Sequence, residues 1–304
     1  MFTVINLFMV VILSTPRMKN VLRQLLWPLI FVTCISATAY GIHIGHDSLI
    51  FSITYFFLGL TLWQLERKMP FERTWLVNDG QMWPDFLHTL FSKLFAYYIT
   101  VSVASFGLLD LFKVWDHFWP NHWPLFFQVC LGLVIAEFGF YWAHRVSHVW
   151  PPMWRFHSVH HSVTRLWFFN TGRFHLGDTL RSMAFSLPLM FVVGAPQVVF
   201  TWVGAITAII GLLTHCNIDM DNRTINWLFN TPNLHRWHHS KNAIEGNTNY
   251  GENLMLWDWL FGSYYNTHIR PPAEIGIKEQ IPTHYIGQVV APFKWEQYRI
   301  KTPI

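Results

Sequence analysis

Charged residues are scarce in this sequence. Lysine, arginine, aspartate and glutamate make up 12% of its 304 residues, whereas an ordinary soluble domain contains about 25%. Hydrophobic residues account for 52% of the chain and aromatic residues for 18%. So few charges cannot cover the surface of a large soluble protein. The composition therefore excludes an ordinary soluble globular protein and indicates a membrane protein.

Cysteine pairs and dense basic runs are also lacking. Cys34, Cys130 and Cys216 show no C-x-x-C spacing, which excludes a disulfide framework and a zinc ribbon. The formal net charge is +4 with neutral histidines, and no basic run is dense enough for binding nucleic acid. This charge suits contact with an anionic membrane surface. No internal repeat or flexible linker divides the chain, so we expect one integrated unit.

Long apolar windows predict an all-α membrane protein with about four transmembrane helices. Each window is near the roughly 20 residues that a spanning helix requires. An earlier apolar run, 4–13, is too short to cross. The stretch 180–214 is too long for one crossing, and we expect it to fold back at Gly194-Ala195-Pro196 as a re-entrant or short helical hairpin. The four windows cover residues 22–42, 48–65, 86–112 and 125–143.

Basic residues orient these predicted helices. They cluster before the first window, after the second and after the fourth, which places the amino terminus and the region after residue 143 in the cytosol. The membrane is then a bacterial inner membrane or the endoplasmic reticulum. We predict membrane helices over 1–130, a histidine-rich catalytic domain over 131–265 that includes the hairpin, and a cytosolic tail over 266–304. The basic residues are Arg17, Lys19, Arg23, Arg67, Lys68, Arg73, Arg145, Arg155 and Arg165.

Ten of the 17 histidines fall between residues 144 and 239, mostly in three clusters. Positions i, i+3 and i+4 share one face of a helix, so each cluster aims two or three imidazoles at one point. We predict no ligand role for the seven histidines outside this pattern. The clusters are His144-x3-His148, His157-x2-His160-His161 and His235-x2-His238-His239, and His175 and His215 lie singly between them.

This histidine pattern indicates a site for two metal ions. Neutral imidazole binds zinc, copper, iron and nickel, and ten ring nitrogens exceed the coordination number of one ion. An even division gives about five nitrogens per ion and leaves an open position on each for oxygen or water. Open positions are typical of redox oxygenases, whereas a structural zinc site is closed. The predicted hairpin is essential, because it returns the chain to the membrane face where the other histidines lie.

The segments around these histidines resemble a known family. Residues 141–148 (YWAHRVSH), 157–162 (HSVHHS) and 234–239 (LHRWHH) are similar to the three histidine boxes of the fatty acid hydroxylase superfamily, which includes the sterol desaturases. Asn249-Tyr250-Gly251 followed by residues 256–262 (LWDWLFG) resembles the end of that family's metal domain. Residues 173–175 (RFH) and 215–217 (HCN) resemble its two single-histidine positions. The resemblance covers about residues 130–265.

The resemblance implies a non-haem di-iron oxidoreductase that uses O2 to hydroxylate or desaturate a membrane lipid such as a sterol, a fatty acyl chain or a sphingolipid. It also implies two iron ions as the cofactor and a cytosolic histidine domain set on a helical membrane bundle. We find no room for a fused haem electron carrier before the first span or after the histidine region. We therefore expect a separate electron donor, a cytochrome or ferredoxin with an NAD(P)H reductase.

Carboxylates near the clusters are candidates for orienting the imidazoles, because a metal-bound histidine usually donates its other N–H to a carboxylate or carbonyl. Glu137 is the most pointed candidate, since it lies inside an apolar span two turns before His144. We interpret the run Leu166-Trp167-Phe168-Phe169 as part of an interfacial aromatic belt rather than the lining of a substrate path. The candidate carboxylates are Glu137, Asp178, Asp219, Asp221 and Asp258.

Two other classes of protein fit part of this pattern. A metal-ion transporter would place histidines along a path through the membrane, but these collect on one predicted face. A membrane b-type cytochrome needs only paired axial histidines, and ten are superfluous for that purpose. Metal flux without oxygen consumption would favour the transporter, and haem absorption would favour the cytochrome.

Overall fold

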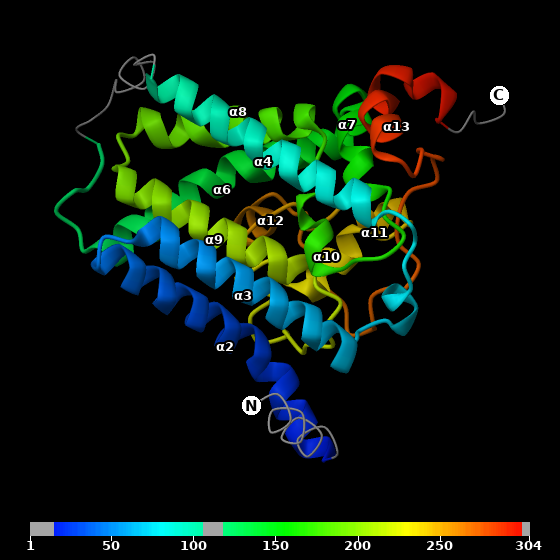
Figure 1. Ribbon diagram of the computed structural model, residues 1–304, viewed down its shortest axis with the longest axis horizontal. Helices are drawn as coiled ribbons and strands as arrows, with labels where there is room; N and C mark the ends of the chain where they lie inside the picture. The colour runs from blue at the N-terminus through cyan, green and yellow to red at the C-terminus, as the bar shows by residue number, and fades with distance from the viewer. Residues whose placement is uncertain (1–14, 106–117, 300–304) are drawn as a thin grey trace.

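The computed structural model describes residues 15–105 and 118–299, and within these ranges the regular elements are all helical. The predicted all-α class is confirmed. The short helices α7 (Pro151–His161), α10 (Pro232–His238) and α11 (Ala243–Gly246) lie at one end of a bundle of long helices, on the right of Figure 1. The long helices are α2 (Pro16–His43), α3 (Asp47–Lys68), α4 (Met82–Ser105), α6 (Leu125–Val149), α8 (Leu176–Val192) and α9 (Gln197–His215).

Four helices among the described residues are long and apolar enough to cross a membrane, namely α2, α3, α6 and α9. The chain is a multi-pass membrane protein, as predicted. Three of these helices correspond to predicted windows, and the fourth, α9, was expected only as one arm of the hairpin. The window 86–112 overlaps α4, which is not among the four. Residues 106–112 and the apolar run 4–13 lie outside the described residues.

The predicted fold-back between residues 180 and 214 is confirmed. Helix α8 ends at Val192 and α9 begins at Gln197. Between them Gly194 has a φ of 72°, a left-handed conformation that glycine adopts without steric penalty. The turn returns α9 to the end of the bundle from which α8 started. His215 at the end of α9 therefore reaches the same end as α7 and α10 (Figure 1).

Glycines on α6 allow this helix to pack closely against the hairpin. A Cβ atom at Gly139 would lie 2.4 Å from the carbonyl oxygen of Phe185 in α8, and one at Gly132 would lie 2.4 Å from a methyl group of Val199 in α9. Of the apolar span of α9, 61% is buried, against 11% of that of α3. Helix α9 is thus central in the bundle, whereas α3 is peripheral and presents apolar side chains such as Phe56 to the surroundings.

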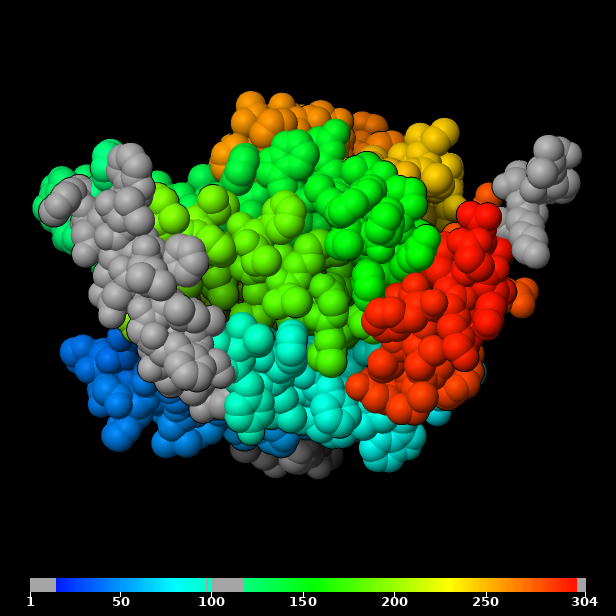
Figure 2. Space-filling model, turned by 90° about the horizontal axis from the view of Figure 1, so that it is seen from above, coloured from blue at the N-terminus to red at the C-terminus, as the bar shows by residue number. Residues whose placement is uncertain are grey.

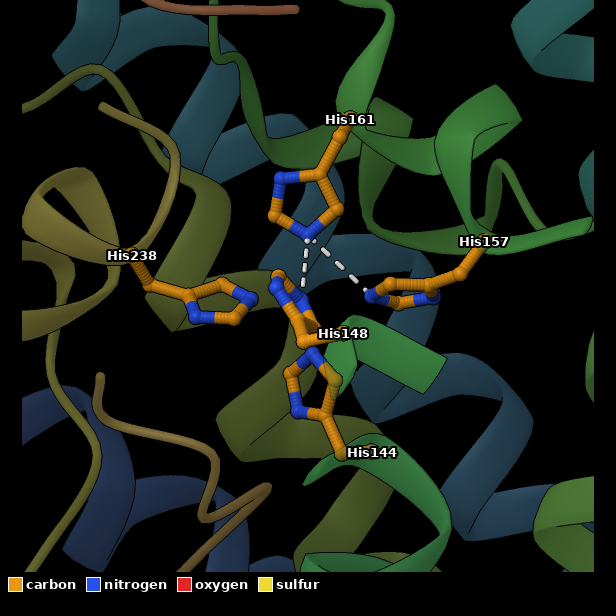
Figure 3. A group of neighbouring side chains, drawn as sticks. All are labelled: His144, His148, His157, His161 and His238. Carbon is orange, nitrogen blue, oxygen red and sulfur yellow. Dashed lines mark hydrogen bonds between the residues drawn. The ribbon is translucent and has the colours of Figure 1, made fainter. Parts of the chain in front are cut away.

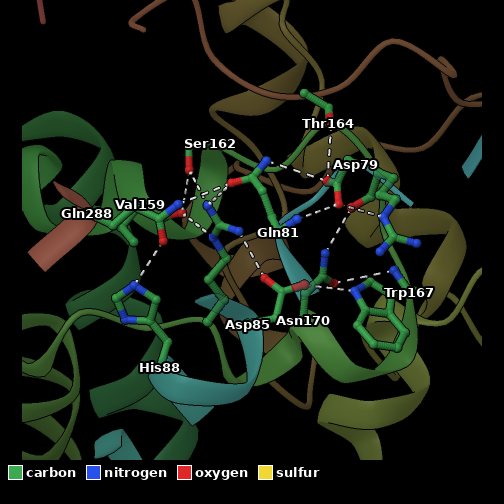
Figure 4. A network of polar contacts seen from close by, with 12 residues as sticks. Asp79, Gln81, Asp85, His88, Val159, Ser162, Thr164, Trp167, Asn170 and Gln288 are labelled. Carbon is green, nitrogen blue, oxygen red and sulfur yellow. Dashed lines mark hydrogen bonds and ion pairs between the residues drawn. The ribbon is translucent and has the colours of Figure 1, made fainter. Parts of the chain in front are cut away.

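The carboxy-terminal elements α13 (Tyr285–Val290) and η3 (Ala291–Gln297) pack against α4 and α7. Figure 2 shows this segment in red beside them. A buried polar network reinforces the contact (Figure 4): Arg173 pairs with Asp85 of α4 at 2.9 Å and donates to the carbonyl of Val159 in α7. Gln81 accepts hydrogen bonds from Arg173 and from Gln288 of α13. The network holds the end of α7 that carries the second histidine cluster.

Candidate metal centre

Nine of the ten predicted histidines converge in two groups, in which every ring is buried except the half-buried His148. Within each group, one ligand nitrogen per ring lies within 4.8 Å of the others. Figure 3 shows the five rings of the first group pointing toward one another from α6, α7 and α10. Three separated parts of the chain therefore meet at one place. The first group is His144, His148, His157, His161 and His238, and the second is His160, His215, His235 and His239.

Each pair of adjacent histidines is divided between the two groups. His161 belongs to the first group and His160 to the second, and His238 and His239 are divided in the same way. Consecutive residues of a helix point about 100° apart, so one pair supplies rings to two neighbouring points. The two groups are in contact, because the ring centroids of His161 and His239 lie 4.4 Å apart. The doubled histidines are thus the feature that builds two adjacent sites from one set of helices.

Hydrogen bonds orient four of the five rings in the first group. In each, Nδ1 faces a protein oxygen, which is a carboxylate, a side-chain amide or a backbone carbonyl. An oxygen acceptor requires a proton on Nδ1, so Nε2 retains its lone pair and faces the centre of the group. The pairs are His144 with Tyr250 (2.8 Å), His148 with Asn247 (3.0 Å), His157 with Asp178 (2.9 Å) and His238 with Thr248 (2.7 Å).

The inward nitrogens of the first group fit a metal ion. The Nε2 atoms of His148 and His157 each lie 3.1 Å from Nε2 of His161, and with Nδ1 protonated neither of them can donate. The Nε2 atoms of His144 and His238 have no hydrogen-bond partner among the described residues. Buried lone pairs left facing one another are costly. A cation between them would satisfy them all.

The second group has four rings, one of which is oriented by a contact between Nδ1 and a protein oxygen. Nδ1 of His215 lies 2.9 Å from Oδ1 of Asn170, and its Nε2 lies 2.8 Å from Nε2 of His235. Nε2 of His239 lies 3.1 Å from that same His235 nitrogen. Nδ1 of His160, His235 and His239 has no partner in the described part of the chain. Four ring donors would leave an octahedral ion with two open positions, against one in the first group.

His175 lies apart from both groups, so the prediction of a tenth ligand does not fit the structure. Its ring packs against Phe156 and Phe293. Nδ1 accepts the N–H of Gly177 at 2.9 Å, and Nε2 lies 3.1 Å from the carbonyl oxygen of Val289. Nδ1 is engaged because His175 caps the start of α8, and Nε2 is engaged by the backbone of α13. The expected even division into five and five is replaced by five and four.

Among the five candidate carboxylates, Asp178 is the one that contacts a histidine of the groups. One of its oxygens accepts from Nδ1 of His157 at 2.9 Å, and the other forms an ion pair with Arg181. Asp178 therefore orients a ring of the first group directly. Asp219 and Asp221 instead form ion pairs with Arg23 and Arg223.

Asp258 and Glu137 act on a loop rather than on a ring. Asp258 accepts the N–H groups of Tyr250 and Gly251, each at 2.8 Å, and so fixes the carbonyl that faces His144. Glu137 accepts the backbone N–H of Asn253 at 3.0 Å and its side-chain amide at 2.8 Å. The sequence prediction that Glu137 partners a histidine is wrong. An intramembrane acid was expected to serve the metal site, but here it satisfies backbone donors of the loop that enters the bundle.

Burial keeps the rings neutral. It lowers the pKa of His238 to about 4, and it lowers the pKa of five further site histidines well below the usual value. Imidazole binds a metal only in its neutral form. The groups are therefore ready to bind at neutral pH. The five are His157, His160, His161, His235 and His239.

Sequence reasoning missed two asparagines that contact the site. Asn170, which is 1% exposed, presents Oδ1 to His215 and donates from Nδ2 to the carbonyl of Arg165. Asn247 presents Oδ1 to His148. The sequence feature that could have pointed to Asn170 is its position, because its polar side chain directly follows the aromatic run 166–169. That run was interpreted as an interfacial belt, but its Phe168 is 8% exposed and packs in the core.

Comparison of the sequence with known proteins identifies the family of this chain. The model of the fatty acid hydroxylase family matches residues 129–263. An ornithine lipid hydroxylase of Rhizobium tropici is 43% identical over 286 residues, which cover 92% of this chain and 86% of that protein. The chain belongs to the fatty acid hydroxylase family. No solved structure matches it.

Two relatives of lower sequence identity to this chain are lipid monooxygenases. An alkylglycerol monooxygenase of Danio rerio is 26% identical over 81% of this chain, which spans only 54% of that protein. Methylsterol monooxygenase 2-2 of Arabidopsis thaliana is 22% identical over 69% of this chain and 80% of that protein. The predicted class, a membrane oxidoreductase that hydroxylates lipids, is confirmed. The relatives do not support the metal-ion transporter.

Proposed function

We propose that this chain is a di-iron, O2-dependent hydroxylase of an amino-acid membrane lipid of the ornithine lipid kind. The observation that carries the proposal is the pair of adjacent histidine groups, five and four rings, in which ring nitrogens face one another at 2.8–3.1 Å. The relative that is 43% identical is an ornithine lipid hydroxylase, which supports an amino-acid lipid as the substrate. Two iron ions held there would supply O2 activation for attack on an unactivated C–H bond.

The residues of the chain hold and orient this centre. Nine histidines would serve as ligands, and Asp178 together with the carbonyls of Tyr250 and Thr248 fixes which nitrogen three of these rings present. Such supporting hydrogen bonds hold ring orientation and raise ligand basicity. Burial of the groups beneath the loop 247–254 excludes bulk water from the reacting atoms. The second group offers four rings against five in the first, so an ion held there would have more room for O2.

The histidine end of the bundle faces the cytosol in this proposal. Arg23 near the start of α2 forms an ion pair with Asp219 at 2.8 Å, and Arg67 and Lys68 end α3 beside the segment that follows His215. Basic residues thus gather at the end that carries the metal centre, as the positive-inside rule requires of a cytosolic face. A separate electron donor, a cytochrome or ferredoxin served by an NAD(P)H reductase, has access to it there.

Metal analysis and lipid analysis together test the proposal. The purified full chain should contain two irons, and His160→Ala should lower this number, whereas His268→Ala, at an exposed histidine outside both groups, should not. Cells that express the chain under ¹⁸O2 should contain an amino-acid lipid that gains one ¹⁸O atom. A chain that holds iron and receives electrons but labels no amino-acid lipid would contradict the substrate. Two tightly bound zinc ions without oxidation would contradict the reaction.

A further inference from the structure

An apolar cavity of about 470 Å³ lies inside the helix bundle beside the second histidine group. Its walls come mainly from α4, α6, α8 and α9, with apolar side chains such as Met190 and Val203. At one side it is lined by Phe174, whose ring stacks on His160 with centroids 4.6 Å apart. The cavity therefore extends from the membrane interior to a residue in contact with the metal centre.

Two side chains of opposite charge, Glu252 and Lys93, line this cavity, whose other lining residues are apolar or carry hydroxyl groups. The backbone N–H of Glu252 donates to Glu137 at 2.6 Å, which fixes its position. Its carboxylate forms no hydrogen bond or ion pair within the described ranges. The neighbouring Asp178 and Arg181 pair with each other, and their charges act on Glu252 in opposite directions, Asp178 raising its pKa and Arg181 lowering it.

Lys93 stands at the junction of the cavity with an outer groove. Its Nζ lies 3.0 Å from the hydroxyl of Tyr55 and 4.6 Å from the centre of that ring, and no described carboxylate pairs with it. Lys93 also lines an apolar groove between α3 and α4, together with Phe56, Leu60 and Phe169. The groove and the cavity share the lining residues Tyr55, Lys93 and Thr171, so acyl chains in the groove would bring a headgroup to the side of the cavity where Lys93 lies.

A carboxylate without a partner in apolar surroundings is costly, and charged side chains inside a membrane protein mark functional sites. Lys93 is exposed at the groove and donates there to Tyr55. Burial, with a contribution from the negative charge of Asp178, raises the pKa of Glu252 to about 7. A cation beside the carboxylate would favour its charged form. A ligand that carries one positive and one negative group would satisfy both side chains at once.

We propose that the cavity binds the zwitterionic headgroup of an amino-acid lipid, with its ammonium group on Glu252 and its carboxylate on Lys93. The assignment rests on the proposed function, because ornithine lipids carry a free amine and a free carboxylate. It goes further in naming the residues that select such a headgroup over a neutral one. Glu252 and Lys93 are in this sense specificity-determining residues, and neither is a metal ligand.

The test is equilibrium binding of three labelled lipids to the iron-loaded full chain in mixed micelles. The lipids are ornithine lipid, its N-acetyl derivative and its carboxyl methyl ester. The wild-type chain should bind ornithine lipid about 10-fold or more tightly than either derivative, since a charge-assisted pair is lost in each. Glu252→Gln should weaken ornithine lipid by about the same factor and leave the N-acetyl lipid unchanged. Lys93→Gln should likewise weaken the binding of ornithine lipid and leave the binding of the methyl ester unchanged.

Glu274 and Lys278 are exposed and lie outside the cavity. The control variants Glu274→Gln and Lys278→Gln should therefore bind all three lipids as the wild type does. Equal binding of the three lipids by the wild-type chain would overturn the proposal without any variant. Loss of iron from Glu252→Gln would overturn it too, because Glu252 would then serve the metal centre. Selective binding without hydroxylation would instead contradict the proposed function and leave the binding site standing.

Discussion

Replacing Asp178 with asparagine tests whether a carboxylate behind a ligand controls the metal centre. The side chain of Asp178 is 0% exposed and that of His157 is 2% exposed, with 2.9 Å between Oδ2 and Nδ1. Asparagine keeps the size of the side chain but removes its charge. It also deprives Arg181, whose side chain is 6% exposed, of its ion-pair partner.

Two effects of this substitution differ in size and can be measured separately. Loss of a supporting partner typically lowers metal affinity 10- to 100-fold, which corresponds to about 1.4–2.7 kcal/mol. Loss of one member of a buried ion pair costs about 3–5 kcal/mol of folding free energy. We therefore expect Asp178→Asn to bind iron more weakly and to unfold at a lower temperature even without metal.

Competition with a chelator gives the iron affinity, and thermal unfolding of the metal-free chain gives the stability. Asp221→Asn is the matched control, because Asp221 pairs with Arg223, whose side chain is 75% exposed, away from the histidines. Wild-type iron affinity in Asp178→Asn, combined with a lower unfolding temperature, would refute the reasoning. Asp178 would then stabilise α8 through Arg181 without tuning the metal.

Three further predictions concern the ligands, the pH dependence and the polar network. His160→Ala leaves three rings in the second group and His238→Ala leaves four in the first, so metal analysis should show a larger iron loss for His160→Ala, and equal losses would contradict the division into groups. In the metal-free chain the folded pKa of His238 is about 4, below the unfolded value of about 6.5. The unfolded state binds more protons between these values, so stability present above pH ~6.5 is lost as pH falls. His238 alone contributes about 2 kcal/mol of this loss at pH 5, and an unfolding temperature unchanged between pH 7 and pH 5 would count against it. Asp85→Ala leaves Arg173 buried and unpaired and should lower the unfolding free energy by about 3–5 kcal/mol in chemical denaturation; a change below 1 kcal/mol, on the order of a surface pair, would show that the network is not structural.

Spacing along the chain was enough to predict the histidine boxes, because i, i+3 and i+4 positions share a helix face whatever the rest of the protein does. His160, His161, His238 and His239 could be singled out in this way, and the apolar length of residues 180–214 required a turn that Gly194 provides. Single residues between the boxes lacked such a periodic signal. His175 and His215 looked alike in the sequence, yet one caps a helix and the other joins a group.

Hydropathy and helical periodicity are local properties, so the membrane class, the helical bundle and nine of the ten histidines predicted to meet could be read from the chain alone. The three-dimensional packing was needed to show that the rings divide into five and four, that Asp178 contacts a ring while Glu137 supports a loop, and that Glu252 and Lys93 line one cavity. These outcomes depend on contacts between residues far apart in the chain. Their geometry follows from how closely α6, α8 and α9 pack, which no local pattern records.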